Sequence, residues 1–88
     1  MSRVSSHESA FSLREVVQNS VLNSRVPAKV LAEAVQKPYP TLMRELNPYD
    51  PNAKLGIETL LAIIKVTEDV EPLAFMARQL GYDLVKTH

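Results

Sequence analysis

The chain has 88 residues, which is enough for one domain, and 45% of them are hydrophobic and 23% charged, a composition typical of a folded globular protein. The absence of cysteine excludes disulfides and cysteine-bound zinc, and the net charge of zero counts against a strongly basic nucleic-acid binder. The longest apolar run, residues 60–64, is too short to span a membrane and no secretory signal is evident, so we expect a cytoplasmic protein.

The first predicted helix has a complete start signal. Ser12 and Glu15 form a capping box, in which each residue's side chain can bond the other's backbone amide. Phe11 before the cap and Val16 inside the helix can pack together as a hydrophobic staple. The helix is expected to fade at residues 23–24.

Two short helices are predicted next, over residues 27–35 and 40–46. Pro27 and Pro40 suit the first turn of a helix, where the donor that proline lacks is not needed. A loop over residues 47–52 follows, because two prolines and two asparagines there stop regular structure. The inward residues of the two helices are expected to be Val30, Leu31, Ala34, Val35, Leu42 and Leu46.

The fourth predicted helix covers residues 56–66 and the fifth begins near Pro72. Gly81 suits a left-handed stop after the fifth helix. The tail over residues 82–85 alternates apolar and polar side chains, which allows a short strand. Helical spacing assigns to the core faces of the two helices Ile57, Leu60, Leu61, Ile64, Leu73, Met76, Ala77 and Leu80.

Together these elements predict an all-α fold of five short helices. We expect a flexible N-terminal segment over residues 1–10, a single domain over residues 11–82, and a tail over residues 83–88.

Residues 28–47 hold the strongest functional signal. A helix-turn-helix lays one short helix across the DNA backbone and a second one in the major groove. Ala32 supplies the small side chain that a close crossing of the two helices requires. With Leu42 and Leu46 directed to the core, the outer face of the second helix is free to read bases. The pattern therefore predicts a DNA-binding domain.

These residues also resemble a known family. The segment Lys37-Pro38-Tyr39-Pro40-Thr41-Leu42, followed by Leu-Asn-Pro at 46–48, an apolar helix and a final segment ending in Leu-Gly-Tyr at 80–82, is similar to the CII-like phage regulatory family. The likeness covers about residues 27–82. It implies a lambda-repressor-like helix-turn-helix fold and a phage or prophage transcription regulator that binds operator DNA as an oligomer.

Three positions depart from the common helix-turn-helix pattern. Gln36 stands where most such turns have glycine, and a left-handed glutamine is costly, so we expect a wider turn. Lys37 and Glu45 occupy positions that are apolar in many repressors, although Lys37 agrees with the CII-like pattern. A buried glutamate without a partner is expensive, so we expect the third helix to be rotated to expose Glu45.

Arg44 is the best candidate for reading a base, because a guanidinium donates two hydrogen bonds to guanine N7 and O6. Its alternative is an incidental surface ion pair. Tyr39 and Met43 have core packing as their alternative. The base-contacting candidates are Tyr39, Pro40, Thr41, Met43 and Arg44, and the phosphate-contacting candidates are Arg25, Lys29, Lys37 and Asn47.

So few positive charges imply weak binding by one protomer, so we expect a homo-oligomer, a dimer or higher, on double-stranded operator DNA. The tail residues Tyr82, Leu84 and Val85 are candidates for the oligomer contact, as is an apolar surplus on the last two helices that includes Ile63 and Phe75.

The second hypothesis is a protein-interaction module of the same fold that binds a repressor or another protein and not DNA. The net charge of zero, with −2 over residues 48–70, motivates it. An enzyme is not expected, because no glycine-rich phosphate loop or cysteine nucleophile is present and the two histidines, His7 and His88, lie at opposite ends of the chain. No metal, cofactor or membrane partner is expected.

Overall fold

The computed structural model describes residues 12–87, and over that range it contains five α-helices and no strand. The predicted all-α fold is confirmed. Phe11 and the N-terminal segment 1–10 lie outside the described residues, as does the hydrophobic staple expected at Phe11. The helices are α1 (Leu13–Leu22), α2 (Ala28–Ala34), α3 (Tyr39–Leu46), α4 (Ile57–Thr67) and α5 (Glu71–Gln79).

The helix starts follow the local signals of the sequence. The Glu15 amide donates to Ser12 Oγ at 3.1 Å and the Ser12 amide donates to Glu15 Oε1 at 2.7 Å, so the predicted capping box is present. Pro27 and Pro38 occupy the positions just before α2 and α3. Pro27 thus lies one residue earlier than predicted, while Pro40 lies in the first turn of α3 as expected.

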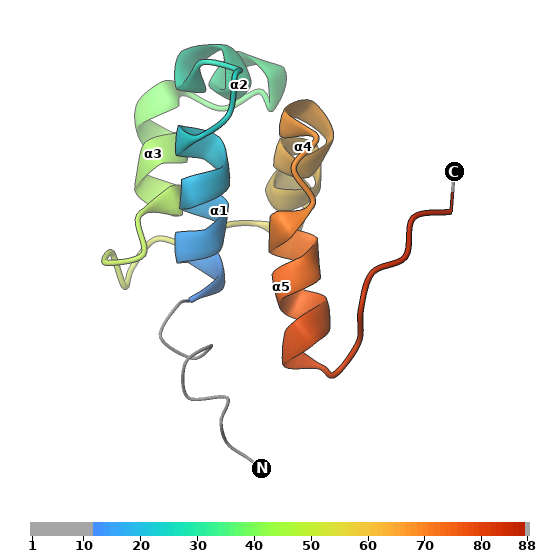
Figure 1. Cartoon of the computed structure of the whole chain (residues 1–88). Helices are drawn as coiled ribbons and strands as arrows, with labels where there is room; N and C mark the ends of the chain where they lie inside the picture. Colours follow the sequence, from blue (N-terminus) through green and yellow to red (C-terminus); the bar gives the residue numbers. More distant parts are fainter. Residues whose placement is uncertain (1–11, 88) are drawn as a thin grey trace.

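Helix α1 is the centre of the arrangement. It packs against α3 on one side and against α4 and α5 on the other, and α2 crosses the end of this layer, where it contacts α3 and α4 (Figure 1). The core lies where α1 to α4 meet. Its buried apolar residues are Val17, Val21, Leu31, Ala32, Leu42, Leu46, Ala53 and Ile63.

The turn between α2 and α3 is closed by a left-handed residue. Gln36 has φ 61°, its amide donates to the Glu33 carbonyl, and the Lys37 amide donates to the Ala32 carbonyl. This is the hydrogen-bond pattern that usually ends on glycine. The expectation of a wider turn at Gln36 was therefore wrong, because the two bonds of the tight turn form even though the residue is not glycine.

The inward face of α4 also differs from the prediction. Ile63, assigned to an outer surplus, is fully buried, whereas Ile57, assigned to the core face, is 81% exposed and Leu61 is about half exposed. Leu60 and Val66 pack against the core beside Ile63. The error arises because α4 is apolar nearly all round, so spacing alone does not distinguish its two faces.

The chain after α5 forms no strand, which corrects the expected short strand at residues 82–85. Gly81 has φ 87° and ends α5 as predicted. Beyond it the tail runs along the side of the molecule away from α3 (Figure 1), with Tyr82 and Val85 largely exposed. A strand needs a partner for its backbone groups, and none of the described residues offers one.

Candidate nucleic-acid interface

The outer face of α3 is exposed over its whole length. Pro40, Thr41 and Arg44 are exposed and recur at helical spacing, while Leu42 and Leu46 on the opposite side are buried. Helix α3 thus shows a small, partly polar surface on a firmly packed support. Four of the five base-contact candidates, Tyr39 included, lie on this exposed surface.

Positive charge lies beside the N-terminal end of α3. The Lys29 ammonium on α2 stands 5.7 Å from the centroid of the Tyr39 ring, which is a cation–π distance. Tyr39 keeps 39% of its surface exposed. Arg25, in the loop before α2, is exposed as well. The interaction joins the start of α2 to the start of α3 and leaves both residues accessible from outside.

Lys37 and Glu45 form an ion pair across the turn. Lys37 Nζ lies 3.1 Å from Glu45 Oε2, and the two side chains are only 27% and 18% exposed. We expected α3 to be rotated so that Glu45 is exposed. This prediction was wrong, because the Glu45 side chain is largely buried beside Lys37. The lysine beside it offsets part of the cost of placing a carboxylate there. Lys37 consequently braces α3 against the turn and has less freedom to reach a phosphate.

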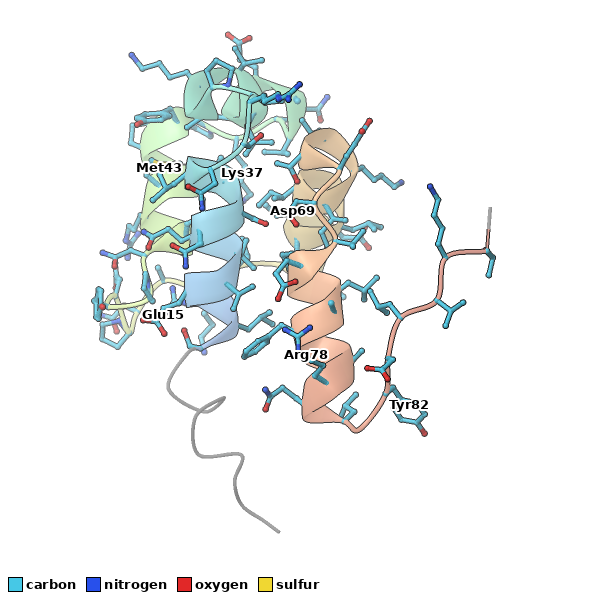
Figure 2. All side chains as sticks on the ribbon, in the orientation of Figure 1. Glu15, Lys37, Met43, Asp69, Arg78 and Tyr82 are labelled. Atoms are coloured by element: carbon cyan, nitrogen blue, oxygen red, sulfur yellow. The ribbon has the colours of Figure 1, made fainter. Side chains whose placement is uncertain are left out.

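Two other candidates hold contacts within the protein. Met43 is partly buried and packs against the core (Figure 2), the alternative role that was left open for it. The Asn47 side chain accepts a hydrogen bond from the Tyr49 amide at 2.9 Å and shapes the loop after α3. Neither side chain is displayed on the outer face as Arg44 is.

Arg44 meets a carboxylate at the surface. Its Nε donates to Asp50 Oδ2 at 3.1 Å, and the Arg44 side chain is 64% exposed. The ion pair expected as the alternative is thus present. Contacts with the Asn52 amide, followed by the Arg44 charge, lower the pKa of Asp50 below its usual 3.8. The carboxylate is therefore charged at neutral pH.

Arg14 on α1 was missed by the sequence analysis. Its guanidinium donates to three backbone carbonyls: Glu45 at 3.2 Å, Asp50 at 2.8 Å and Ala53 at 2.9 Å. It ties the end of α3 and the α3–α4 loop to α1. No signal in the sequence predicts this, because the three acceptors lie 31 to 39 residues further along the chain.

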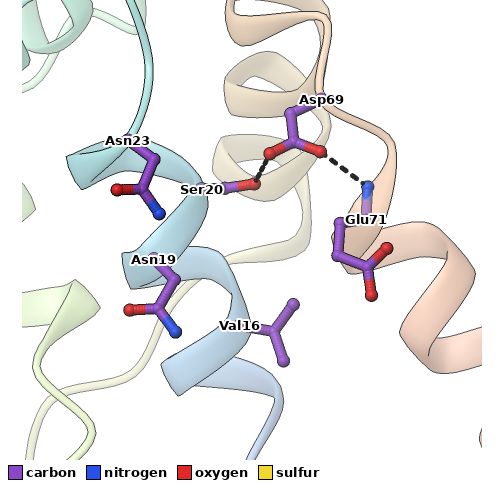
Figure 3. A pocket seen from close by; sticks show the side chains of 6 residues that line it. All are labelled: Val16, Asn19, Ser20, Asn23, Asp69 and Glu71. Atoms are coloured by element: carbon purple, nitrogen blue, oxygen red, sulfur yellow. Dashed lines mark hydrogen bonds between the residues drawn. The ribbon is translucent and has the colours of Figure 1, made fainter.

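Ser20 and Asp69 connect α1 to the start of α5. The buried Ser20 hydroxyl donates to Asp69 Oδ2, and Asp69 Oδ1 accepts from the Glu71 amide at 3.0 Å (Figure 3). The junction borders a pocket of about 260 Å³. Both oxygens of Asp69 are occupied, so the carboxylate serves as a joint between helices. The pocket is lined by Val16, Asn19, Ser20, Asn23, Asp69 and Glu71.

A second surface is apolar. A pocket of about 280 Å³ with entirely apolar walls lies between α4 and α5. Further exposed apolar residues are Leu80, just after α5, and those of the tail, where Tyr82 lies past the end of α5 (Figure 2). We call this surface the α4–α5 face. Its members are Ile57, Leu61, Leu73, Leu80, Tyr82, Leu84 and Val85.

The fold and these surfaces define an all-α protein with an exposed, partly basic two-helix unit on one side and an apolar face on another. The profile of the family described as phage regulatory protein CII (CP76) matches residues 12–88. The chain belongs to this family and is a phage transcription regulator. No curated protein and no solved structure gives a significant match.

Within residues 12–87, no helix has the length and apolar character needed to cross a membrane.

Proposed function

We propose that the protein is a sequence-specific DNA-binding regulator in which α2, the turn and α3 act as a helix-turn-helix. Helix α3 enters the major groove of operator DNA and α2 lies across the backbone. The observation that carries the proposal is the pairing of a buried inner side, at Leu31, Leu42 and Leu46, with an exposed outer side on α3. Such a helix is rigid enough to hold side chains in register with base edges.

The proposed contact set is narrower than the one expected from the sequence. Arg44 reads a base, with Thr41 and Pro40 beside it, and Tyr39 contacts DNA from the start of α3. Arg25 and Lys29 contact phosphates. Lys37, Met43 and Asn47 support the unit through their contacts inside the protein.

The number of charges argues for more than one protomer. Arg25 and Lys29 neutralise roughly two phosphates, which gives a slope of log K against log salt of about −1.8 for one protomer. So few phosphate contacts supply only a small part of the affinity that specific binding needs at physiological salt. Two protomers on half-sites about one helical turn apart double the charge contacts and the base contacts.

We propose that the α4–α5 face forms the oligomer contact. The walls of its pocket are apolar and its seven members are 42–82% exposed, and exposed apolar patches often mark protein–protein contacts. The tail lies on the side away from α3 (Figure 1), so association through it leaves the proposed DNA-reading side open. The residues expected from the sequence, Tyr82, Leu84 and Val85, are part of this face.

The proposal is tested by selection from random duplex DNA with the wild type, Arg44→Ala and Arg78→Ala. Arg78 is the matched control, because it is also an exposed arginine paired with a carboxylate, Glu71, but lies on α5. We expect the wild type and Arg78→Ala to select the same repeated motif. Arg44→Ala should lose the preference at one base pair per half-site, a discrimination of about 10- to 100-fold.

Absence of enrichment by the wild type at low salt would refute DNA reading. The protein-interaction module would then be favoured, since the α4–α5 face offers a surface for a protein partner. Equal relaxation of the motif by Arg44→Ala and Arg78→Ala would refute the role of α3 and leave only a general charge effect.

The oligomer contact is tested by sedimentation of two charge variants. Leu61 on the α4–α5 face and Val30 on α2 are about equally exposed, at 49% and 50%. Leu61→Glu is expected to weaken self-association at least tenfold, because it places a charge in an apolar contact, whereas Val30→Glu should leave it unchanged. Equal effects of the two variants, or a monomeric wild type, would contradict the assignment.

A further inference from the structure

Asp50 is held in place on several sides. Its carbonyl accepts from Arg14 at 2.8 Å, its amide donates to the Asn47 carbonyl at 3.2 Å, and its Oδ1 accepts from the Asn52 amide at 3.0 Å. Arg14 itself belongs to α1, in the centre of the fold. The backbone of Asp50 and one oxygen of its carboxylate are thus already fixed by contacts within the protein.

The second oxygen of this carboxylate meets Arg44. The contact uses Nε alone. A guanidinium has five N–H donors in a planar fork, so four donors remain on the two amino groups. Bidentate donation to guanine O6 and N7 needs two of them. Arg44 can therefore keep its bond to Asp50 and still offer a complete reading edge to a base.

An exposed arginine without such a partner samples many rotamers. Ordering it in a complex costs binding free energy, and a misoriented fork donates to the wrong acceptors. A fixed acceptor at Nε removes part of that cost before DNA arrives. It also restricts the plane in which the guanidinium lies, and this matters because base recognition depends on the geometry of two simultaneous bonds.

We propose that Asp50 is a positioning residue for base recognition, which holds the Arg44 guanidinium in its reading orientation through a chain of contacts that runs from Arg14 on α1 to the outer face of α3. This inference rests on the proposed function. It assigns part of the sequence preference to the α3–α4 loop, outside the two helices that contact DNA.

The opposite role is physically distinct. If Asp50 merely competes with DNA for Arg44, its removal frees a cation and removes a negative charge near the phosphates. Affinity would then rise for every DNA sequence alike, and discrimination between bases would stay constant. The two roles therefore differ in one measurable ratio. This is the affinity for the selected DNA site divided by the affinity for a site altered at the base pair that Arg44 reads.

The test compares affinities for the selected site and for a site altered only at the base pair read by Arg44. Asp50→Asn is the main variant, because asparagine keeps one acceptor oxygen for the Asn52 amide and loses the second acceptor that Arg44 uses. Glu33→Gln is the matched control. It removes one exposed charge from α2 without touching Arg44. Asp50→Ser, which retains a shorter acceptor for the loop, is the second variant.

We expect Asp50→Asn and Asp50→Ser to lower the discrimination about 2- to 10-fold and Glu33→Gln to leave it unchanged. In an Arg44→Ala background, Asp50→Asn should have no further effect on discrimination. Unchanged discrimination in Asp50→Asn, or equal effects of Asp50→Asn and Glu33→Gln, would overturn the positioning role alone. Failure of the proposed function is seen elsewhere, in a wild type that selects no site or in an Arg44→Ala variant that discriminates normally.

Discussion

Replacing Arg14 with alanine is expected to destabilise the fold more than replacing the exposed Arg44 or Arg78 with alanine. The guanidinium bonds three carbonyls of the α3–α4 region. A hydrogen bond to a charged group contributes about 1.5–3 kcal/mol, and we take about 1 kcal/mol for each of these because the site is only half-buried. The expected loss is therefore about 3 kcal/mol in the free energy of unfolding.

That loss is large for this chain. At about 0.05–0.15 kcal/mol per residue, 88 residues give a total stability of about 4–13 kcal/mol. Since about 1 kcal/mol shifts the midpoint of a domain of this size by about 4–8 °C, Arg14→Ala should lower the thermal midpoint by about 12–24 °C. Arg14→Lys should recover only part of this, because an ammonium lacks the planar fork that reaches several carbonyls.

The measurement is thermal unfolding followed by circular dichroism, with Arg78→Ala as the control. Arg78 pairs with Glu71 at the surface, at 46% and 52% side-chain exposure, and such pairs contribute less than about 1 kcal/mol. If Arg14→Ala lowers the midpoint no more than Arg78→Ala does, the role of Arg14 as a tie between α1 and the α3–α4 loop is wrong.

Three further predictions concern single residues. Gln36→Gly should stabilise the protein by about 0.5–1 kcal/mol and Gly81→Ala should destabilise it by about 1 kcal/mol, because the two residues have positive φ angles of 61° and 87°, which glycine adopts without strain. Urea unfolding in which both substitutions change the stability in the same direction would contradict this. Ser20→Ala should cost about 1–2 kcal/mol by leaving Asp69 without its buried donor, and a melting curve identical to the wild type would argue against the joint. The pKa of Asp50 is lowered from 3.8, so the stabilisation that its charge provides is complete above pH 3.8 and is lost as the pH falls through the lower, folded-state pKa. The free energies of unfolding of the wild type and Asp50→Asn, measured from neutral to acid pH, should therefore converge only in this acidic range.

The starts and ends of the helices follow from short-range rules. Ser12 and Glu15 cap α1 because they are three residues apart, and Gly81 ends α5 because glycine adopts positive φ without strain. Leu31, Leu42 and Leu46 are buried as their spacing predicts, whereas Val30, expected on the same inward faces, is 50% exposed. The Asp50 turn could also have been recognised, since an aspartate commonly accepts from the amide two residues on.

The candidate site was predicted less completely. The sequence assigns to the candidate site three residues of α3, Tyr39, Thr41 and Arg44, that the structure leaves exposed. It does not distinguish Lys37, which pairs with Glu45, from a lysine that is free to bind phosphate. A paired lysine and a free lysine look alike in the sequence. Only the packing of α3 against the turn decides which lysine has a neighbouring carboxylate.

The sequence by itself determined the all-α class, the five helices of the described range and the resemblance to the phage CII family, because the helices depend on neighbours within one or two helical turns and the resemblance on short motifs. Tertiary structure alone decided that Ile63 faces inward and Ile57 outward, since α4 is apolar on both sides. It also decided the partners of Arg14, which lie more than thirty residues away in sequence and meet it only when α1 packs against α3.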